Sequence, residues 1–360
     1  MIVKMRGRLA RLGLYCLAGL LPAAILVTRP LPVQGQTQTP PAPRAFSLYW
    51  ENDLFTGTDR DYTNGLKLTY SRPYIGRDAP RADSRGWADG IMDALSLLNA
   101  PASQKTVSYS LGQNIYTPKD TQRRELVRDD RPYAGYTYFG VGLHARQGMR
   151  RRVLELDLGV VGPLSMAESL QDVAHDVSDS TRARGWDNQL DNEPTLEIIW
   201  ETKWRLWHKQ LPAGWSADFI PHLGARAGNV AIYANTGAEM RLGWYLPDNF
   251  GSCPIRPGCD LAGAADYGDP PTTSRLPPFG LHLFAGVDGR LVLRDIFLDG
   301  NTFSESHSVD KEPLVADLMI GIVMRYRRLS LSYAYVFRTR EFKQQEQTHA
   351  YGAINLVYTF

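Results

Sequence analysis

Long stretches of this 360-residue chain alternate apolar and polar side chains with a period of two. In "PTLEIIWETKWRLW", Leu196 and Ile198 share one side, and Glu197 and Glu201 take the other. This is the period of a β-strand, whose successive side chains point to opposite faces. A soluble sandwich also alternates in this way, so one such strand does not distinguish it from a barrel. The strands here are long, carry many of the 18 Tyr and 8 Trp, and place charge on the face that would line a lumen.

The whole pattern predicts an all-β fold, a transmembrane antiparallel β-barrel of about twelve strands, an even number as single-chain bacterial barrels require. The last strand, "YGAINLVYTF", ends on an aromatic residue, Phe360, and so resembles the signal that the barrel assembly machinery reads in bacterial outer-membrane barrels. The predicted strands are 44–55, 62–74, 105–117, 134–149, 151–162, 193–209, 215–230, 236–246, 279–300, 313–327, 328–341 and 348–360.

The connections between these strands fall into two kinds. "RYRRLS" and "QGMRRRV" predict tight turns, whereas 75–104, 118–133, 163–192 and 247–278 are long. A barrel of this type has short turns at the periplasmic end and long loops outside the cell. Within 163–185, apolar residues recur at helical intervals with acids opposite them, which predicts a short amphipathic helix in an extracellular loop.

The first residues indicate export. Lys4, Arg6, Arg8 and Arg11 form a basic region without acids, and an apolar run over 12–27 follows. This pattern predicts a secretory signal peptide over 1–35. The polar, Pro-rich residues 36–43 follow as a flexible leader. Residues 44–360 then form a single barrel domain.

Removing the predicted signal peptide changes the charge balance. The chain has 40 Lys and Arg against 38 Asp and Glu, and the first 35 residues hold five of the basic residues and no acid. The remaining chain is therefore slightly acidic, which argues against a nucleic-acid partner. Two cysteines remain, Cys253 and Cys259, and in an exported chain they predict a small loop-closing disulfide.

One stretch, "WENDLFTGTDRDYTNG" over 50–65, crowds acids and amides between two predicted strands. An EF-hand starting at Asp59 would need Gly at its sixth position and Glu at its twelfth, and these positions hold Asn64 and Tyr70. Two readings stay open. Asn52 and Asp53 can supply hard oxygen ligands to a calcium ion, or the stretch is a polar hairpin turn. In a regular strand Asn52 and Asp53 would point to opposite faces.

Other hydrolase signatures are absent from the sequence, which has neither a G-x-S-x-G elbow nor an H-E-x-x-H pair. Among the seven histidines, His175 is the one that lies on the predicted loop helix beside acids. A single histidine in such a place is more often structural than catalytic, so the residue alone does not establish an enzyme.

Five motifs in order give a resemblance over roughly 45–360. They are "ENDLF", "DRDYTNG", "DRPYAG", "LGVVGP" and "GWDNQLDNEP". Together they are similar to the outer-membrane lipid A 3-O-deacylase family. The resemblance implies a twelve-stranded barrel that removes the 3′-linked acyloxyacyl group of lipid A by a mechanism like that of calcium-dependent phospholipase A2. A histidine acts as general base on water, and a divalent cation stabilises the oxyanion.

The resemblance also implies roles for particular residues. Asn52 and Asp53 match the family's Asn-Asp pair, which we expect to bind Ca²⁺ or another divalent cation, and Thr63 matches its threonine. His175 matches the general base, and imidazole titrates in the range that such a base needs. Arg123 and Arg124 fall where some members have a basic pair suited to lipid A phosphates. Some members have an acid six residues after the histidine, where this chain has Thr181.

The sequence therefore predicts a monomeric lipid A deacylase of the Gram-negative outer membrane, with its site near the outer leaflet and lipid A or lipopolysaccharide as substrate. Two alternatives remain. One is a barrel that binds or conducts without catalysis, which Thr181 and the opposite faces of Asn52 and Asp53 favour. The other is an outer-membrane esterase that acts on phospholipid.

Overall fold

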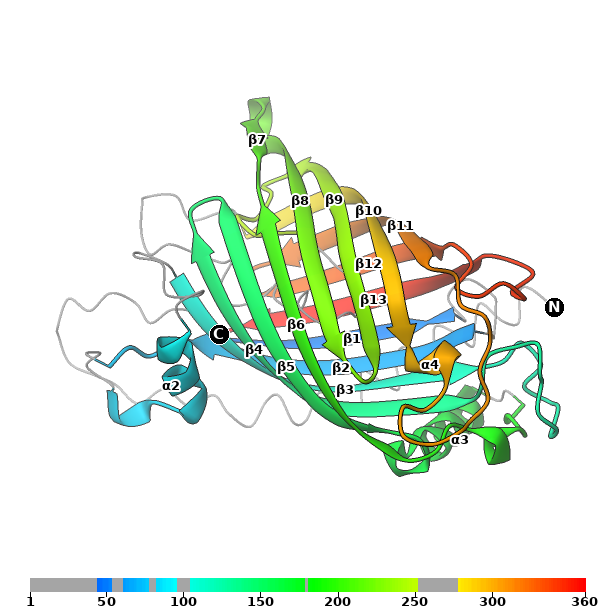
Figure 1. The fold of residues 1–360 in the computed structure, drawn as a ribbon. Helices are drawn as coiled ribbons and strands as arrows, with labels where there is room; N and C mark the ends of the chain where they lie inside the picture. The colour runs from blue at the N-terminus through cyan, green and yellow to red at the C-terminus, as the bar shows by residue number, and fades with distance from the viewer. Residues whose placement is uncertain (1–43, 54–60, 78–81, 96–103, 179–180, 252–277) are drawn as a thin grey trace.

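The computed structural model describes residues 44–53, 61–77, 82–95, 104–178, 181–251 and 278–360. Strands dominate these residues, and Figure 1 shows them as one tilted, closed wall. The strands are β1 (Ala45–Asn52), β2 (Asp61–Pro73), β3 (Gln104–Thr117), β4 (Ala134–Gln147), β5 (Arg150–Val161), β6 (Glu193–Trp204), β7 (Trp207–Gln210), β8 (Trp215–Gly228), β9 (Ala231–Trp244), β10 (Phe279–Asp295), β11 (Leu314–Tyr326), β12 (Leu329–Arg338) and β13 (His349–Thr359).

Neighbouring strands pair antiparallel, and β1 pairs with β13 at one seam while β6 pairs with β8 at another. Twelve strands thus close the wall, and the four-residue β7 lies outside it, paired only with the start of β8. The prediction of a closed antiparallel barrel of about twelve strands is confirmed. The predicted strand 193–209 is two strands, because the chain turns out of the wall at Arg205 and Leu206.

The wall is apolar outside and polar inside, as the alternation requires. One lateral row of outward residues runs through eight adjacent strands by direct pairing. Such an outer band suits contact with lipid, because it offers hydrocarbon chains no unpaired polar group. The row consists of Leu331, Leu356, Leu48, Leu68, Leu111, Phe139, Leu158 and Leu196.

The inner face carries buried ion pairs. Lys67 Nζ lies 3.1 Å from Glu155 Oε1, and Arg241 Nη2 lies 2.6 Å from Asp218 Oδ2. Such pairs keep buried charges compensated where water is largely excluded. They also fill the lumen with side chains rather than leaving an open channel.

Both chain ends of the barrel, Ala45 and Thr359, pair with each other and define one end of the wall. Helix α2 (Trp87–Ala94) lies at this end, and α3 (Ala167–Ser178) and α4 (Ile296–Asp299) lie at the opposite end (Figure 1). We call these the terminal end and the α3 end. The remaining helical turns are η2 (Ala82–Ser84), η3 (Pro163–Ser165), η4 (Trp186–Asn188) and η5 (Pro212–Gly214).

Long connections occur at both ends of the barrel, which differs from the predicted division into a short-turn end and a long-loop end. The β2–β3 and β9–β10 connections leave from the terminal end, as do the tight turns at Gly148 and Arg327. The β3–β4 and β5–β6 connections leave from the α3 end. The predicted helix within 163–185 is confirmed as α3.

Residues 296–299 of the predicted strand 279–300 form the helical turn α4 instead. Asp295 caps this turn by accepting a hydrogen bond from the Phe297 amide, and Gly300 ends it with a φ of 79°. Phe297 then stacks on Tyr116 with ring centroids 3.9 Å apart. α4 therefore folds over the α3 end of the lumen. The predicted signal peptide, the leader, and Cys253 and Cys259 lie outside the described residues.

None of the described helices has the length and apolar character needed to cross a membrane.

Candidate functional site at the α3 end

The Asn-Asp pair lies where β1 ends. Asn52 is the last residue of the strand, and Asp53 follows in a helical turn. Both are buried, with 8% and 0% of their surface exposed. Along β1 the inward residues are odd-numbered, so Asn52 continues the outward side. Because the strand stops there, alternation no longer fixes the direction of Asp53, and the conflict that a regular strand would create does not arise.

Asn52 begins a lateral row across the outer wall. It pairs with Asn64 of β2, Asn64 pairs with Ile115 of β3, and Ile115 pairs with Gly135 of β4. We call these four residues the site row. The Asn64 side-chain oxygen accepts a hydrogen bond of 3.1 Å from Trp50 Nε1. The site row therefore leads around the wall from the Asn-Asp pair to the first turn of α3.

The N-terminal end of α3 rests on Gly135. A Cβ placed on this glycine would lie 2.2 Å from both Ala167 Cβ and Ser165 Oγ, so only glycine allows the helix to approach the wall this closely. Gln113 Nε2 adds a 2.7 Å hydrogen bond to the Ser165 carbonyl. Ile115 lies in the same buried cluster as Ala167. α3 is thus held against the outer face of β3 and β4.

A second contact holds α3 one turn further along. Trp186 Nε1 donates a 2.9 Å hydrogen bond to Gln171 Oε1, and both side chains are buried. Trp186 also packs on Tyr133, with ring centroids 5.0 Å apart. These contacts fix the helix that carries His175, which follows Gln171 by four residues, or about one turn.

Three motifs of the sequence meet at this point. "DRPYAG" supplies Tyr133 and Gly135, and "GWDNQLDNEP" supplies Trp186. "LGVVGP" supplies Gly162, whose amide donates to the Gly135 carbonyl at 3.0 Å and whose φ is 99°. Residues far apart in the chain therefore hold α3 in place together. The sequence motifs contain Gly135 and Trp186, but the sequence alone does not identify these residues or Gln171 as positioning residues.

Thr63 lies in β2, where the pairing with β3 shifts between Tyr62 and Asn64. This irregularity is a bulge, a feature that redirects a side chain at a strand end. The side chains of Thr63 and His175 lie outside the described residues, as do Asp59 and Arg60. The structure therefore places the backbones of β2 and α3 at the same end of the barrel as Asn52 and Asp53.

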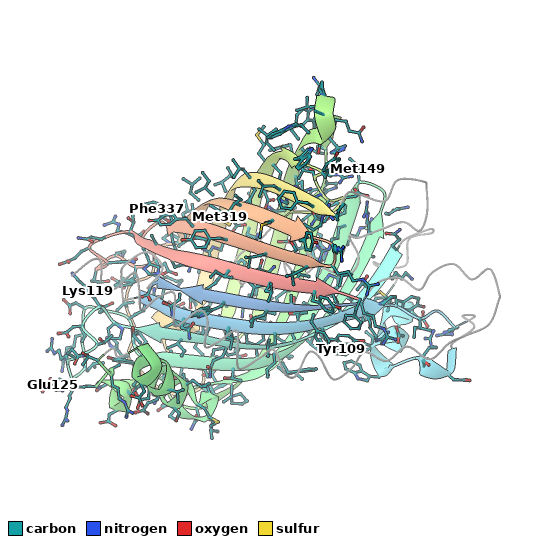
Figure 2. The ribbon with its side chains drawn as sticks, turned by 180° about the vertical axis from the view of Figure 1, so that it is seen from behind. Tyr109, Lys119, Glu125, Met149, Met319 and Phe337 are labelled. Carbon is teal, nitrogen blue, oxygen red and sulfur yellow. The ribbon has the colours of Figure 1, made fainter. Side chains whose placement is uncertain are left out.

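Arg123 and Arg124 are exposed and lie next to the chain that follows α3. The Arg124 carbonyl accepts a 2.7 Å hydrogen bond from Asn188 Nδ2, and the Arg123 carbonyl lies close to Gly185. In Figure 2 the labelled residues Lys119 and Glu125 mark this region. They lie at the α3 end, far from Tyr109 and Met149. The two arginines therefore flank the α3 region and not the lumen.

Two acids of α3 pair with one arginine. Arg182 Nε donates a 2.9 Å hydrogen bond to Asp176, and its Nη1 lies 3.4 Å from Asp172. Thr181 is exposed beside this arginine. Glu168 on the first turn is exposed, and partial desolvation, with Asp172 and Asp187 nearby, raises its pKa. The α3 surface therefore combines acids with a bridging arginine next to the position of His175.

Within the part of the chain that the structure describes, no group of three His, Cys, Asp or Glu side chains is arranged to hold a metal. Asn52 and Asp53 offer an amide oxygen and a carboxylate, both of the hard type that Ca²⁺ prefers. A calcium site here would complete its ligand set with backbone carbonyls and water, as calcium sites commonly do.

A cavity of about 90 Å³ lies in the lumen beneath α4, and four arginines and four tyrosines are among the residues that line it. Phe297 of α4 stacks over Tyr116 and packs near Tyr136 at this level. A volume of this size holds a few waters and not a continuous pore.

Comparisons with known proteins agree with this architecture. Over residues 20–360 the sequence matches the family described as "Outer membrane protein LpxR". Among solved structures, LpxR from Salmonella typhimurium matches with a TM-score of 0.69 at 21% identity, over 88% of this chain and 100% of that chain. The β domain of the Bordetella autotransporter BrkA matches with a TM-score of 0.41 at 10% identity, over 89% and 98% of the two chains.

A search of curated proteins found no match. The match to the LpxR family covers nearly the whole chain, and the likeness to the Salmonella structure covers 88% of it. The chain belongs to the outer membrane protein LpxR family, and it is a β-barrel of the Gram-negative outer membrane.

Proposed function

We propose that this protein is a lipid A 3-O-deacylase that hydrolyses the 3′-linked acyloxyacyl ester of lipid A. The observation that carries the proposal is the site row, which joins the Asn-Asp pair of β1 to the first turn of the helix that holds His175. In this arrangement α3, which carries the candidate base, lies on the outer face of the wall that Asn52 continues. The family to which the chain belongs supports the same substrate class.

The depth of the site suits an ester of lipid A. Along β3 the site row at Ile115 lies four residues beyond the apolar row at Leu111. At about 3.4 Å per residue this is about 14 Å along the strand, and a tilt of about 40° reduces it to about 10 Å of depth. The site row therefore lies near the border of the hydrocarbon region, where the acyl esters of a lipid meet its headgroup.

We place the α3 end on the outside of the cell. An exported chain reaches the outer membrane from the periplasm, and here Ala45 and Thr359 lie together at the terminal end. Insertion that leaves this end in the periplasm puts the α3 end, and its candidate site, in the outer leaflet, where lipopolysaccharide resides.

His175 is the proposed general base, since neutral imidazole takes a proton from water near neutral pH. Asn52 and Asp53 are the proposed ligands of a divalent cation, and when bound the cation supplies positive charge where the ester carbonyl oxygen becomes anionic. Thr63, at the bulge beside them, is proposed to position the ester. Arg123 and Arg124 are proposed to bind lipid A phosphates, because guanidinium groups match phosphate oxygens in charge and geometry.

The first rival is a barrel that binds or conducts without catalysis. Buried ion pairs and α4 occupy part of the described lumen, and the cavity beneath α4 is about 90 Å³, which argues against conduction. Analysis of the lipid A product separates a binding barrel from an enzyme. The second rival, a phospholipid esterase, uses the same site and differs in substrate. The experiment must therefore identify the product.

The test is mass spectrometry of lipid A from cells that express the full chain, the His175→Ala variant or the control His208→Ala. His208 lies on β7 outside the wall. We expect the full chain and H208A to remove the 3′-linked chains and H175A to leave lipid A intact while still folding as a barrel. Unchanged lipid A with the full chain in the presence of Ca²⁺ contradicts the proposal, and release of fatty acid from phospholipid alone supports the second rival.

The proposed cation has a separate test. Asp53→Asn keeps the shape of the side chain and removes its charge, so we expect a higher Ca²⁺ requirement for deacylation. Asp120→Asn, in the β3–β4 connection, serves as the matched control. Equal Ca²⁺ dependence in the two variants removes Asp53 from the ligand set and leaves the assignment of His175 to its own test.

A further inference from the structure

The terminal end of the barrel carries a second surface with a distinct chemistry. On the outer face, Lys105 of β3 pairs with Ala145 of β4, and Ala145 pairs with Arg152 of β5. Arg150 lies one outward position further towards the β4–β5 turn. Each of the three has the strand parity of the apolar outer face and not that of the lumen. We call Lys105, Arg150 and Arg152 the cation row.

Aromatic side chains accompany these cations. Lys105 Nζ lies 5.0 Å from the ring centroid of Tyr74, and the guanidinium carbon of Arg150 lies 5.6 Å from that of Trp204. Cations and aromatic rings together are typical of the level at which a membrane protein meets lipid headgroups.

Helix α2 covers the middle of this surface. Ala88 and Met92 are buried in one cluster with Val107 and Ala145, so the helix packs on the outer wall between the cations. On the neighbouring side of the helix, Trp87 and Ile91 are exposed by 59% and 43%. An amphipathic helix that leaves Trp and Ile exposed beside basic residues is suited to the interface of a bilayer.

A buried ion pair holds α2 in this position. Asp89 is fully buried, and Arg72 Nη2 lies 2.7 Å from its Oδ2. The amide of Ile75 donates a further 3.0 Å hydrogen bond to Asp89 Oδ1. The helix is therefore a fixed part of the wall, and its exposed side keeps one orientation.

The level of the cation row along the barrel axis indicates what it binds. Ten residues of β3 separate Lys105 from Ile115 of the site row. At about 3.4 Å per residue this is about 34 Å along the strand, and a tilt of about 40° reduces it to about 26 Å. The apolar band of an outer-membrane barrel is about 25 Å tall. The cation row and the site row therefore lie at the two borders of one hydrocarbon layer.

The positive charge of the cation row favours anionic lipids over neutral ones. At a bilayer border, Lys and Arg attract anionic headgroups, by about 1 kcal/mol for each residue near the surface. The leaflet at the terminal end is, in the orientation proposed above, the periplasmic leaflet, which consists of glycerophospholipids. We propose that the cation row and α2 bind the headgroup phosphates of anionic glycerophospholipids in that leaflet. This proposal does not depend on the deacylase activity.

Native mass spectrometry of the delipidated full chain tests this proposal, with phosphatidylglycerol or phosphatidylcholine of identical acyl chains added. We expect the full chain to retain phosphatidylglycerol in preference. The variant K105S/R150S/R152S is expected to reduce that preference about tenfold or more. The variant K105R/R150K/R152K, which keeps the charges, is expected to preserve it. The matched control K119S/R128S/K343S, with its three changes at the α3 end, is also expected to preserve it.

A misfolded variant would also lose phosphatidylglycerol. The salt dependence of binding is therefore measured on the full chain itself. Retention of phosphatidylglycerol is expected to weaken as ionic strength rises, because salt screens exposed charges. Equal retention of both lipids by the full chain, an unchanged preference in the triple serine variant, or an equal loss in the α3-end control each overturns the proposal. Retention that is insensitive to salt does so as well.

Discussion

Gly135 and Ala167 are in contact so close that a single added methyl group cannot be accommodated: a Cβ on the glycine would lie 2.2 Å from that of the alanine. A strand of the barrel and the first turn of α3 thus meet backbone to side chain. The position of His175 relative to Asn52 depends on this contact, because α3 and β4 are joined here.

Gly135→Val is therefore expected to push α3 away from the wall and reduce deacylation by about tenfold or more, since displacements near 1 Å impair catalysis strongly. Deacylation of lipid A in membranes measures this. Gly289→Ala is the control, because a Cβ added at this glycine would have its nearest neighbour, the Thr236 carbonyl oxygen, at 3.8 Å. Full activity in Gly135→Val shows that α3 does not need this contact.

The hydrogen bond between Trp186 and Gln171 predicts a local loss of stability. Gln171→Leu leaves the buried Trp186 N–H without its acceptor, at a cost of about 1–3 kcal/mol. We expect faster hydrogen exchange in α3 and unchanged exchange in the barrel strands. Leu170→Ala, at an exposed position on the same helix, should change exchange much less. Similar exchange in the two variants would mean that the bond does not hold the helix.

The raised pKa of Glu168 predicts a pH dependence of α3. Partial desolvation of this exposed side chain, and then the nearby Asp172 and Asp187, disfavour the charged carboxylate, so the docked helix binds the proton more tightly than the undocked chain. Docking therefore loses stability as pH rises through the raised pKa. Exchange protection of α3, corrected for intrinsic rates, should be higher at pH 5 than at pH 8. Glu168→Gln should remove the difference, and its persistence in that variant assigns it to another group.

Arg72 predicts the behaviour of α2. Arg72→Met removes the partner of the buried Asp89, and breaking a buried pair typically costs about 3–5 kcal/mol. We expect α2 to leave the wall and become sensitive to protease, while the barrel stays folded and active. Arg77→Met is the control, because Arg77 is largely exposed where it pairs with Asp93. Protease resistance equal to that of the full chain would show that Arg72 is dispensable.

The barrel could be predicted because the pattern that identifies each strand lies within the residues of that strand. Alternation with a period of two identifies each strand, and an apolar outer face follows from the same pattern. The exceptions are also local in cause. β7 continues the alternation of β6 after the turn at Arg205, and the apolar run of α4 fits a strand as well as a buried helical turn.

The candidate site was predictable in its residues and not in its geometry. Resemblance suggested Asn52 and Asp53, but the site row depends on the register between β1, β2, β3 and β4, which no single strand encodes. The roles of Gly135 and Gln171 likewise appear only when α3 is in place. Helix α2 was missed because its eight residues lie in a segment read as a loop.

Both α2 and α3 lie against the outer face of β3 and β4, at opposite ends of the barrel. The barrel therefore has a front and a back within the plane of the membrane. On the other side of Asn52, the described wall continues through Gly352 of β13 to Tyr335 of β12 without a helix. A lipid that diffuses in two dimensions would approach the site from this side, so the rate of encounter depends on how the barrel is rotated among its neighbours.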